Sequence, residues 1–152
     1  MPADPPLARL FAIGYRLLID GLHARLRERG WSDVRPAFGF VLLAVREERA
    51  TSTDLAALMG TTKQAASKLV DTMAAAGYVE RHTAADDGRR RPVGLTERGR
   101  ALLAAVEEIY AELEREWAAV LGGGELERLR GDLVRVLTDD GAGALPPVRP
   151  TL

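Results

Sequence analysis

Residues 62–73 carry side chains suited to contact with nucleic acid. On a helical wheel, at about 100° per residue, their apolar and polar residues fall on opposite arcs. The apolar arc holds Ala66, Leu69, Val70 and Met73, and the polar arc holds Lys63, Gln64, Ser67, Lys68 and Asp71. Glutamine pairs with adenine, lysine with guanine or phosphate, and serine with either, so this face predicts contacts to base edges in a major groove. A plain solvated face is the alternative.

The start of this segment favours a phosphate. Thr62 stands where a hydroxyl side chain caps a helix by accepting a hydrogen bond from a free backbone amide. The other free amides and the partial positive charge of a helix amino terminus attract an anion. We therefore expect Thr62 to lie against a nucleic-acid backbone.

A run of arginines stands in the turn between two predicted strands. Arg89, Arg90 and Arg91 directly follow Asp87 and Gly88. Arginine at a turn tip suits the minor groove, where the negative potential is enhanced. Asp87 is close enough in sequence to hold the Arg89 guanidinium by a paired hydrogen bond, and Gly88 allows the backbone between them to bend. A solvated charged turn is the alternative.

Helical periodicity dominates the elements that must position these two features. Helices are predicted over residues 7–26 (ending near Gly30), 36–48, 51–59, 62–76, 96–121 and 125–137, and strands over 78–82 and 92–95. Gly60 ends the third helix, whose Leu55, Leu58 and Met59 are expected to pack against the apolar arc of the fourth. The region after Thr138 is rich in glycine and proline and is expected to be disordered.

Composition and charge narrow the function classes. The chain has 152 residues, no cysteine and two histidines, which removes disulfides, thiolate metal sites and thiol redox sensing, and makes a metal site unexpected. No apolar run is long enough to cross a bilayer, and the start does not resemble a secretory signal, so a cytoplasmic location is expected. Residues 1–50 and 51–100 each carry eight basic and six acidic residues, whereas 101–152 carry five and ten. The acidic excess lies in the last third, away from the proposed contact region.

Several ordered motifs resemble the MarR family of bacterial transcription regulators. They are Thr53-Asp54-Leu55-Ala56, Thr62-Lys63-Gln64-Ala65-Ala66-Ser67-Lys68-Leu69-Val70, Gly77-Tyr78-Val79-Glu80-Arg81, Asp87-Gly88-Arg89-Arg90 and Leu95-Thr96-Glu97-Arg98-Gly99. The match is continuous from about residue 51 to residue 103. One departure concerns the wing, where the family often has an Asp-Pro pair and this chain has Ala84-Ala85.

The resemblance implies a mainly α fold with a small β-hairpin wing: a winged helix-turn-helix DNA-binding core flanked by amino- and carboxy-terminal dimerisation helices. The parts expected are a first helix and connector over 1–35, the DNA-binding region over 36–100, dimerisation helices over 101–138 and a tail over 139–152. The wing arginine and its aspartate partner match Arg89 and Asp87. A homodimer is implied, with an interface including Leu7, Leu10, Leu126, Leu129, Leu133 and Leu137. Two-fold symmetry predicts a pseudo-palindromic site on double-stranded DNA.

The main hypothesis is therefore a dimeric, sequence-specific transcription regulator, most often a repressor in such families. A winged-helix protein-interaction module that does not bind DNA is the alternative. An enzyme is the weakest hypothesis, because the sequence lacks the common nucleophile, phosphate-loop and zinc motifs, and no cofactor is expected.

Similar regulators bind small, often aromatic molecules in a crevice beside the dimerisation helices. Residues near the first connector that suit such a pocket are Tyr15, His23, Trp31, Phe38 and Phe40, although core packing is an alternative for Phe38 and Phe40.

Overall fold

The computed structural model describes residues 3–82, 91–139 and 143–146. Within these ranges it contains six helices and one two-stranded antiparallel sheet. The elements are α1 (Leu7–Glu28), α2 (Phe38–Ala44), α3 (Ser52–Met59), α4 (Lys63–Ala75), β1 (Val79–Arg81), β2 (Val93–Leu95), α5 (Glu97–Leu121) and α6 (Glu125–Leu137). Among the described residues, no helix has both the length and the apolar character that a bilayer crossing requires.

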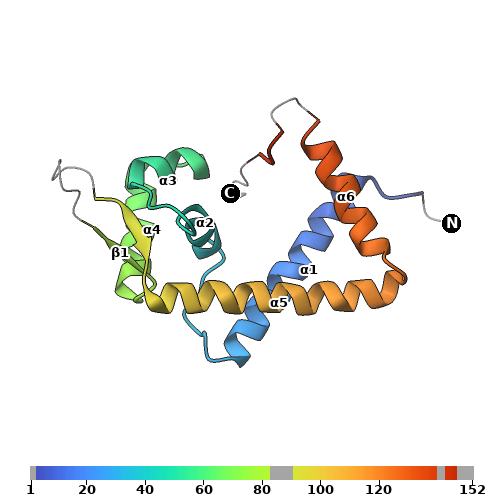
Figure 1. The fold of residues 1–152 in the computed structure, drawn as a ribbon, viewed down its shortest axis with the longest axis horizontal. Helices are drawn as coiled ribbons and strands as arrows, with labels where there is room; N and C mark the ends of the chain where they lie inside the picture. The colour runs from blue at the N-terminus through green and yellow to red at the C-terminus, as the bar shows by residue number, and fades with distance from the viewer. Residues whose placement is uncertain (1–2, 83–90, 140–142, 147–152) are drawn as a thin grey trace.

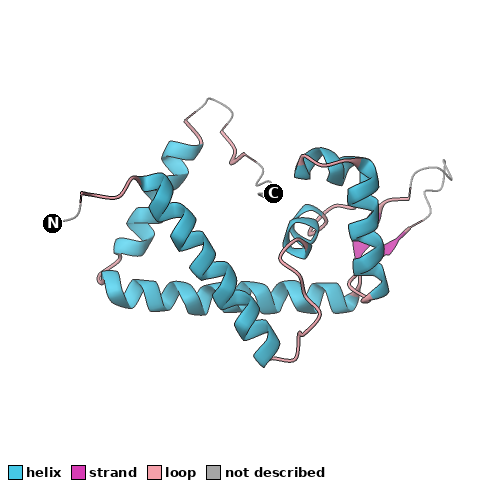
Figure 2. Cartoon of the chain, turned by 180° about the vertical axis from the view of Figure 1, so that it is seen from behind, coloured by secondary structure: helices cyan, strands magenta, loops and turns pink. Residues whose placement is uncertain are grey.

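The long helix α5 connects two groups of elements (Figure 1). Helices α2, α3 and α4 and the hairpin gather around its amino-terminal end, while α1 crosses it and α6 folds back from its far end. The view from behind shows the same division (Figure 2). Because α5 belongs to both groups, it transmits any tilt of one group to the other.

The core of the first group forms where one face of each short helix meets the hairpin. Leu55 of α3, Val70 and Met73 of α4 and Val93 of β2 are fully buried. The predicted apolar arc of the fourth helix is confirmed, since Ala66, Val70 and Met73 are buried and Leu69 packs against them. Leu58 departs from its prediction: it is 42% exposed and does not join this core.

The second helix is shorter than its periodicity predicts. It ends at Ala44, whereas a helix to residue 48 was expected. Two residues past that expected end, Ala50 pairs with Val93: the Ala50 amide donates to the Val93 carbonyl oxygen at 3.1 Å, and the Val93 amide donates to the Ala50 carbonyl oxygen at 2.7 Å. The chain must leave the helix early to reach this strand edge, so tertiary pairing overrides the local pattern.

Two ion-pair groups attach the outer helices to α5. Arg25 of α1 and Arg29, the residue that follows α1, contact three carboxylates of α5: Glu108, Glu112 and Glu116. Arg25 lies 3.2 Å from Glu112 and Arg29 lies 3.1 Å from Glu108. Arg130 of α6 donates to Glu114 of α5 at 2.7 Å. The carboxylates in the last third of the chain are thus partly used to join helices.

The first turn of α5 passes close to the backbone that enters the hairpin. Thr96 caps the helix by accepting from the Gly99 amide at 3.0 Å, and the Thr96 amide donates to the Tyr78 carbonyl at 3.1 Å. A Cβ atom at Gly99 would lie 2.0 Å from that carbonyl oxygen. Only glycine fits here without moving the helix or the strand.

We predict that Gly99→Ala lowers the free energy of unfolding by about 2 kcal/mol or more, because the added methyl overlaps a backbone atom that cannot rotate away. Gly39→Ala in α2 is the matched control, since a Cβ atom there meets nothing within 4 Å. The control is expected to be neutral or stabilising by up to about 1 kcal/mol. Urea unfolding at equal protein concentration measures both, and equal values for the two variants would contradict the packing argument.

Candidate nucleic-acid interface

A tight, capped turn joins α3 to α4. Thr51 and Asp54 form a reciprocal capping box at the start of α3: the Asp54 amide donates to Thr51 Oγ1 at 3.2 Å and the Thr51 amide to Asp54 Oδ2 at 3.0 Å. Gly60 ends α3 with φ +65°, a left-handed conformation that glycine adopts at little cost. Thr62 then caps α4 by accepting from the Ala65 amide at 3.0 Å. The local sequence thus specifies two helices and the reversal between them.

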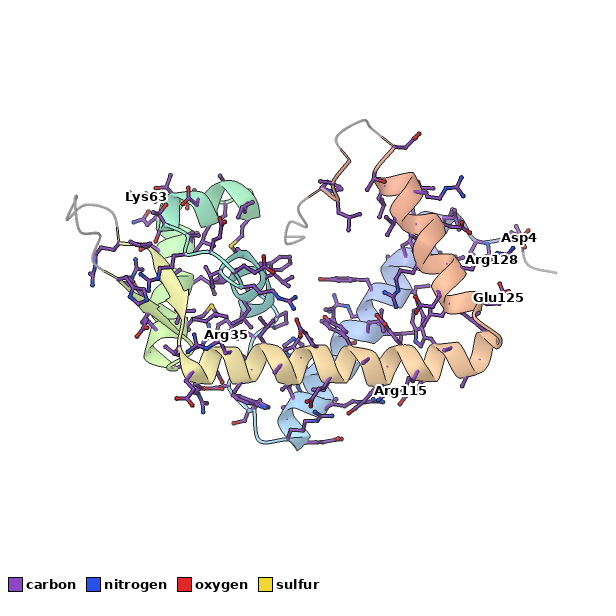
Figure 3. The ribbon with its side chains drawn as sticks, viewed as in Figure 1. Asp4, Arg35, Lys63, Arg115, Glu125 and Arg128 are labelled. Atoms are coloured by element: carbon purple, nitrogen blue, oxygen red, sulfur yellow. The ribbon has the colours of Figure 1, made fainter. Side chains whose placement is uncertain are left out.

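The outer face of α4 presents Lys63, Gln64 and Lys68. All three are exposed, as is Thr62 at the capped end. Figure 3 shows Lys63 at the outer edge of the helical group. These side chains occupy the first two turns, which are the turns that enter a major groove when such a helix contacts DNA.

Two other residues of the predicted polar arc, Ser67 and Asp71, contact an arginine of the hairpin. The Arg81 guanidinium of β1 donates to the Ser67 carbonyl oxygen at 3.1 Å, to Ser67 Oγ at 3.2 Å and to Asp71 Oδ1 at 2.8 Å. It also donates to Ser52 Oγ, at the start of α3, at 3.3 Å. Arg81 therefore joins both helices to the hairpin, and its side chain is only 18% exposed.

The described part of the hairpin ends at its base. Val79 pairs with Leu95, Glu80 with Gly94 and Arg81 with Val93. Arg91 is exposed just before β2. Asp87, Arg89 and Arg90 lie outside the described residues.

An aromatic and ionic cluster ties the connector after α1 to the start of α5. Tyr78 donates through its hydroxyl to Asp33 and accepts from Arg98 Nη2 at 3.2 Å. The Arg98 guanidinium carbon also lies 5.2 Å from the centroid of the Trp31 ring and 4.8 Å from that of the Tyr78 ring. Burial, followed by the Asp33 carboxylate, raises the pKa of Tyr78. These contacts favour the neutral phenol, which can donate to Asp33.

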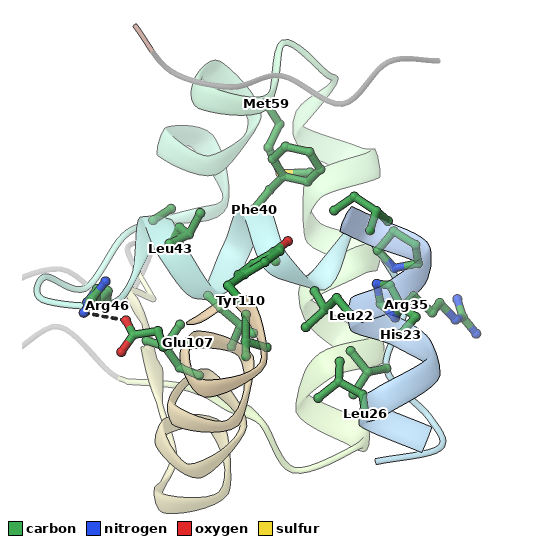
Figure 4. Close-up of a pocket in the computed structure, with 18 of the residues that line it drawn as sticks. Leu22, His23, Leu26, Arg35, Phe40, Leu43, Arg46, Met59, Glu107 and Tyr110 are labelled. Atoms are coloured by element: carbon green, nitrogen blue, oxygen red, sulfur yellow. Dashed lines mark ion pairs between the residues drawn. The ribbon is translucent and has the colours of Figure 1, made fainter. Parts of the chain in front are cut away.

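A separate cavity of about 460 Å³ opens between α1, α2 and α5 (Figure 4). Tyr15, His23 and Phe40 line it, as their sequence positions suggested. Trp31 and Phe38 do not: Trp31 packs on Tyr78, and Phe38 is 1% exposed in the core with its ring centroid 6.0 Å from that of Tyr78. Leu58 and Met59, from the last turn of α3, also reach the cavity wall.

Comparison with known proteins supports one family. The family model described as "MarR family" matches residues 39–90, a range that holds most of α2 and all of α3, α4 and β1. The reduced form of MarR from E. coli superposes with a TM-score of 0.75 at 25% sequence identity, covering 88% of this chain and 98% of that one. These matches support the MarR family of winged-helix regulators. The fold of this chain is a winged helix-turn-helix, as the sequence predicted.

Two further solved structures share the fold. A complex of S. aureus MepR with DNA has a TM-score of 0.66 at 23% identity, covering 90% of this chain and 99% of that one. The transcriptional regulator Tm0710 from Thermotoga maritima has a TM-score of 0.65 at 21% identity, covering 88% and 92%. No curated protein sequence matches.

Arg81 is the residue of this candidate interface whose structural contacts the sequence did not predict. It stands in one of the motifs that carry the family resemblance, but a single exposed-looking arginine in a short strand gives no sign of which helix it reaches. The available signal was the pair Ser67 and Asp71, four residues apart on one helix face, which together offer acceptors to one guanidinium.

We predict that Arg81→Ala lowers the free energy of unfolding by about 1–3 kcal/mol, because it leaves partly buried acceptors on Ser52 and Ser67 without their donor. Asp71→Ala removes only the exposed ion pair and is expected to cost less than about 1 kcal/mol. Arg81→Lys is not expected to restore stability, since an ammonium group lacks the planar fork. Thermal and urea unfolding measure all three, and an Asp71→Ala effect as large as that of Arg81→Ala would contradict the role of the serine contacts.

Proposed function

We propose that this chain is a homodimeric, sequence-specific DNA-binding transcription repressor that a small molecule releases from DNA. The observation that carries the proposal is the outer face of α4: a capped helix start with Lys63, Gln64 and Lys68 exposed over its first two turns. Glutamine and lysine are side chains that read adenine and guanine edges or hold phosphates. The similarity to the MarR family supports the same function.

The remaining contacts come from the helix start, from Ser67 and from the wing. Thr62 and the free amides beside it suit a backbone phosphate. Ser67 keeps hydroxyl capacity beyond its bond to Arg81, since a hydroxyl has both a donor and two acceptor sites. Arg89, Arg90 and Arg91 would enter or flank the minor groove, with Asp87 holding Arg89.

The dimer proposal rests on apolar surface that the described chain leaves uncovered. Leu7 is 67% and Leu10 46% exposed at the start of α1. Helix α6 has no buried residue: Leu129 and Leu137 are exposed, and Leu126 and Leu133 are only half-buried. Exposed leucines on two helices that lie at the same end of the molecule indicate a face for a second copy (Figure 1).

Each part of the chain would then have its own function. Residues 1–35 and 101–138 would form the dimer, residues 36–100 would contact DNA, and residues 139–152 would form a tail outside both. Glu125 at the start of α6 lies far along the molecule from Lys63 (Figure 3), so the acidic first turn of α6 lies away from the proposed DNA face.

Release by a ligand follows from the position of the cavity. Leu58 and Met59 line it and stand directly before Gly60, the turn that sets α4. A molecule that displaces these side chains shifts the last turn of α3 and with it the DNA-contacting helix. Such a ligand would bind the DNA-free arrangement more tightly and so lower the affinity for DNA.

We predict that selection from random duplexes yields an inverted repeat whose half-sites lie about 10 base pairs apart, one helical turn, as a two-fold dimer requires. Gln64→Ala is expected to lose about 1–3 kcal/mol of preference at one base position in each half-site while leaving the repeat intact. The measurement compares the sequences selected by the original protein with those selected by the Gln64→Ala variant. Selected sequences that contain a single half-site, or no repeat, would contradict the dimer. An unchanged base preference in the Gln64→Ala variant would contradict the role of Gln64.

A salt titration separates backbone contacts from base contacts. Lys68→Ala is expected to weaken binding to all sequences alike and to reduce the slope of log affinity against log salt by about 1. Arg89→Ala is expected to weaken operator binding by about 1–3 kcal/mol, because it removes a wing charge. Arg115→Ala on α5 is the control of equal charge and should change neither quantity. A protein-interaction module would show no steep salt dependence for any of them.

A further inference from the structure

We propose that the cluster of Trp31, Asp33, Tyr78 and Arg98 (the Tyr78 cluster) fixes the angle between α4 and the long helix α5, and so determines which half-site spacing a dimer of this chain accepts on DNA. Its members are positioning residues, because none of them is placed on the proposed DNA face. Since spacing has a meaning only for a dimer on an inverted repeat, this role rests on the proposed function.

Two chain segments join the winged group (α2, α3, α4 and the hairpin) to the rest of the molecule. One runs from β2 directly into α5 through Thr96, and the other is the connector between α1 and α2. Figure 1 shows α5 leaving this group and continuing to α6. A group held by one segment alone can rotate about it, whereas a tie between the two segments removes that freedom.

Tyr78 lies where α4, β1 and α5 meet. Its amide donates to the Met73 carbonyl oxygen of α4 at 3.0 Å, and its carbonyl oxygen accepts from the amide of Thr96, the cap of α5, at 3.1 Å. The residue is 0% exposed. The backbone of Tyr78 therefore moves together with α4 and with the first turn of α5.

The side chain of Tyr78 adds the connector to this junction. Its hydroxyl donates to Asp33 Oδ1 and accepts from Arg98 Nη2 at 3.2 Å. Arg98 Nη2 in turn lies 3.8 Å from Asp33 Oδ2. The Trp31 ring centroid lies 6.1 Å from that of Tyr78, and the Arg98 guanidinium carbon lies 5.2 Å from the Trp31 centroid. The connector, the end of α4 and the first turn of α5 thus meet at one phenol.

The polar contacts of the Tyr78 cluster are suited to setting geometry. The side chains of Asp33 and Arg98 are 47% and 50% exposed, and an ion pair so open to water adds little to stability. Hydrogen bonds are directional, however, and hold both the distance and the angle between the segments that they join. Removing them is therefore expected to loosen the angle between α4 and α5 while the buried rings keep the group folded.

In a two-fold dimer this angle sets how far apart the two α4 helices lie and how they are turned. One added base pair moves a half-site by about 3.4 Å and rotates it by about 35° around the duplex. A stiff dimer binds such a site only by deforming the DNA, which costs free energy. A loosened dimer adapts instead, so the stiffness of the Tyr78 cluster makes binding specific for one spacing.

Asp33→Ala tests this role in the full-length protein. Affinity is measured for the operator that the original protein selects, and for the same operator with one base pair inserted or removed at its centre. We expect the original protein to bind the altered operators at least about tenfold more weakly, and Asp33→Ala to bind them less than about threefold more weakly than its own best site. Asp33→Asn keeps an oxygen that accepts from the Tyr78 hydroxyl, and is expected to retain the original spacing dependence.

A second variant and a control separate positioning from stability. Tyr78→Phe keeps the buried ring, removes the hydroxyl and is expected to relax the spacing dependence as Asp33→Ala does. Asp20→Ala is the matched control, since Asp20 also lies beside an arginine, Arg16, at 3.9 Å, but on an exposed face of α1. It should keep the original spacing dependence.

The ratio of affinities among the three operators is the decisive quantity. A loss of stability, followed by the melting temperature, lowers the folded fraction and weakens binding to all three operators alike, so it leaves the ratio unchanged. An unchanged ratio in Asp33→Ala and Tyr78→Phe, an equal change in Asp20→Ala, or an Asp33→Asn protein as permissive as Asp33→Ala would overturn the proposal.

Failure of the proposed function gives a different result. If the original protein selects no duplex and binds none of the three operators, the repressor proposal is wrong, and the role of the Tyr78 cluster falls with it. If the original protein distinguishes the spacings and every variant does so equally well, only the role of the cluster is wrong.

Discussion

The contacts of Arg81 are the constraint on which the helix-turn-helix part of this protein depends. One guanidinium bonds to α4 through Ser67 and Asp71 and to the start of α3 through Ser52, while its backbone belongs to the hairpin. The two helices and the strand therefore cannot move independently. A capped helix of thirteen residues is marginal by itself, so the orientation of Lys63, Gln64 and Lys68 is set by this tertiary contact.

The contacts of Arg81 also explain how a hairpin with such short strands can be stable. The strands have three residues each and, within the part of the chain that the structure describes, pair only with one another and with Ala50. A hairpin so short has little stability of its own. Arg81 on one strand and the close approach of Gly99 to Tyr78 hold it from two sides.

Much of the fold could be predicted from the sequence because its signals are local. Thr51, Thr62 and Thr96 each cap the helix that the periodicity predicts, and Gly60 ends α3 in a left-handed conformation. Other features depend on partners far away in the sequence, so local signals could not predict them. The end of α2 is set by Val93, the role of Ser67 by Arg81, and the burial of Phe38 and Trp31 by Tyr78. Three residues of the candidate pocket share one cavity: Tyr15, His23 and Phe40. They do so because α1 and α2 converge there, and the spacing of these residues along the chain does not specify that convergence.

The length of α5 gives the molecule a mechanical property. A helix of 25 residues is about 37 Å long, at about 1.5 Å per residue. A rotation of about 5° at its far end displaces its amino-terminal end by about 3 Å over that lever arm. In a two-fold assembly both arms would move, and the separation of the two winged domains would change by up to twice that amount. In the proposed dimer, small repacking near the symmetry axis would therefore move the two winged domains out of register with successive major grooves.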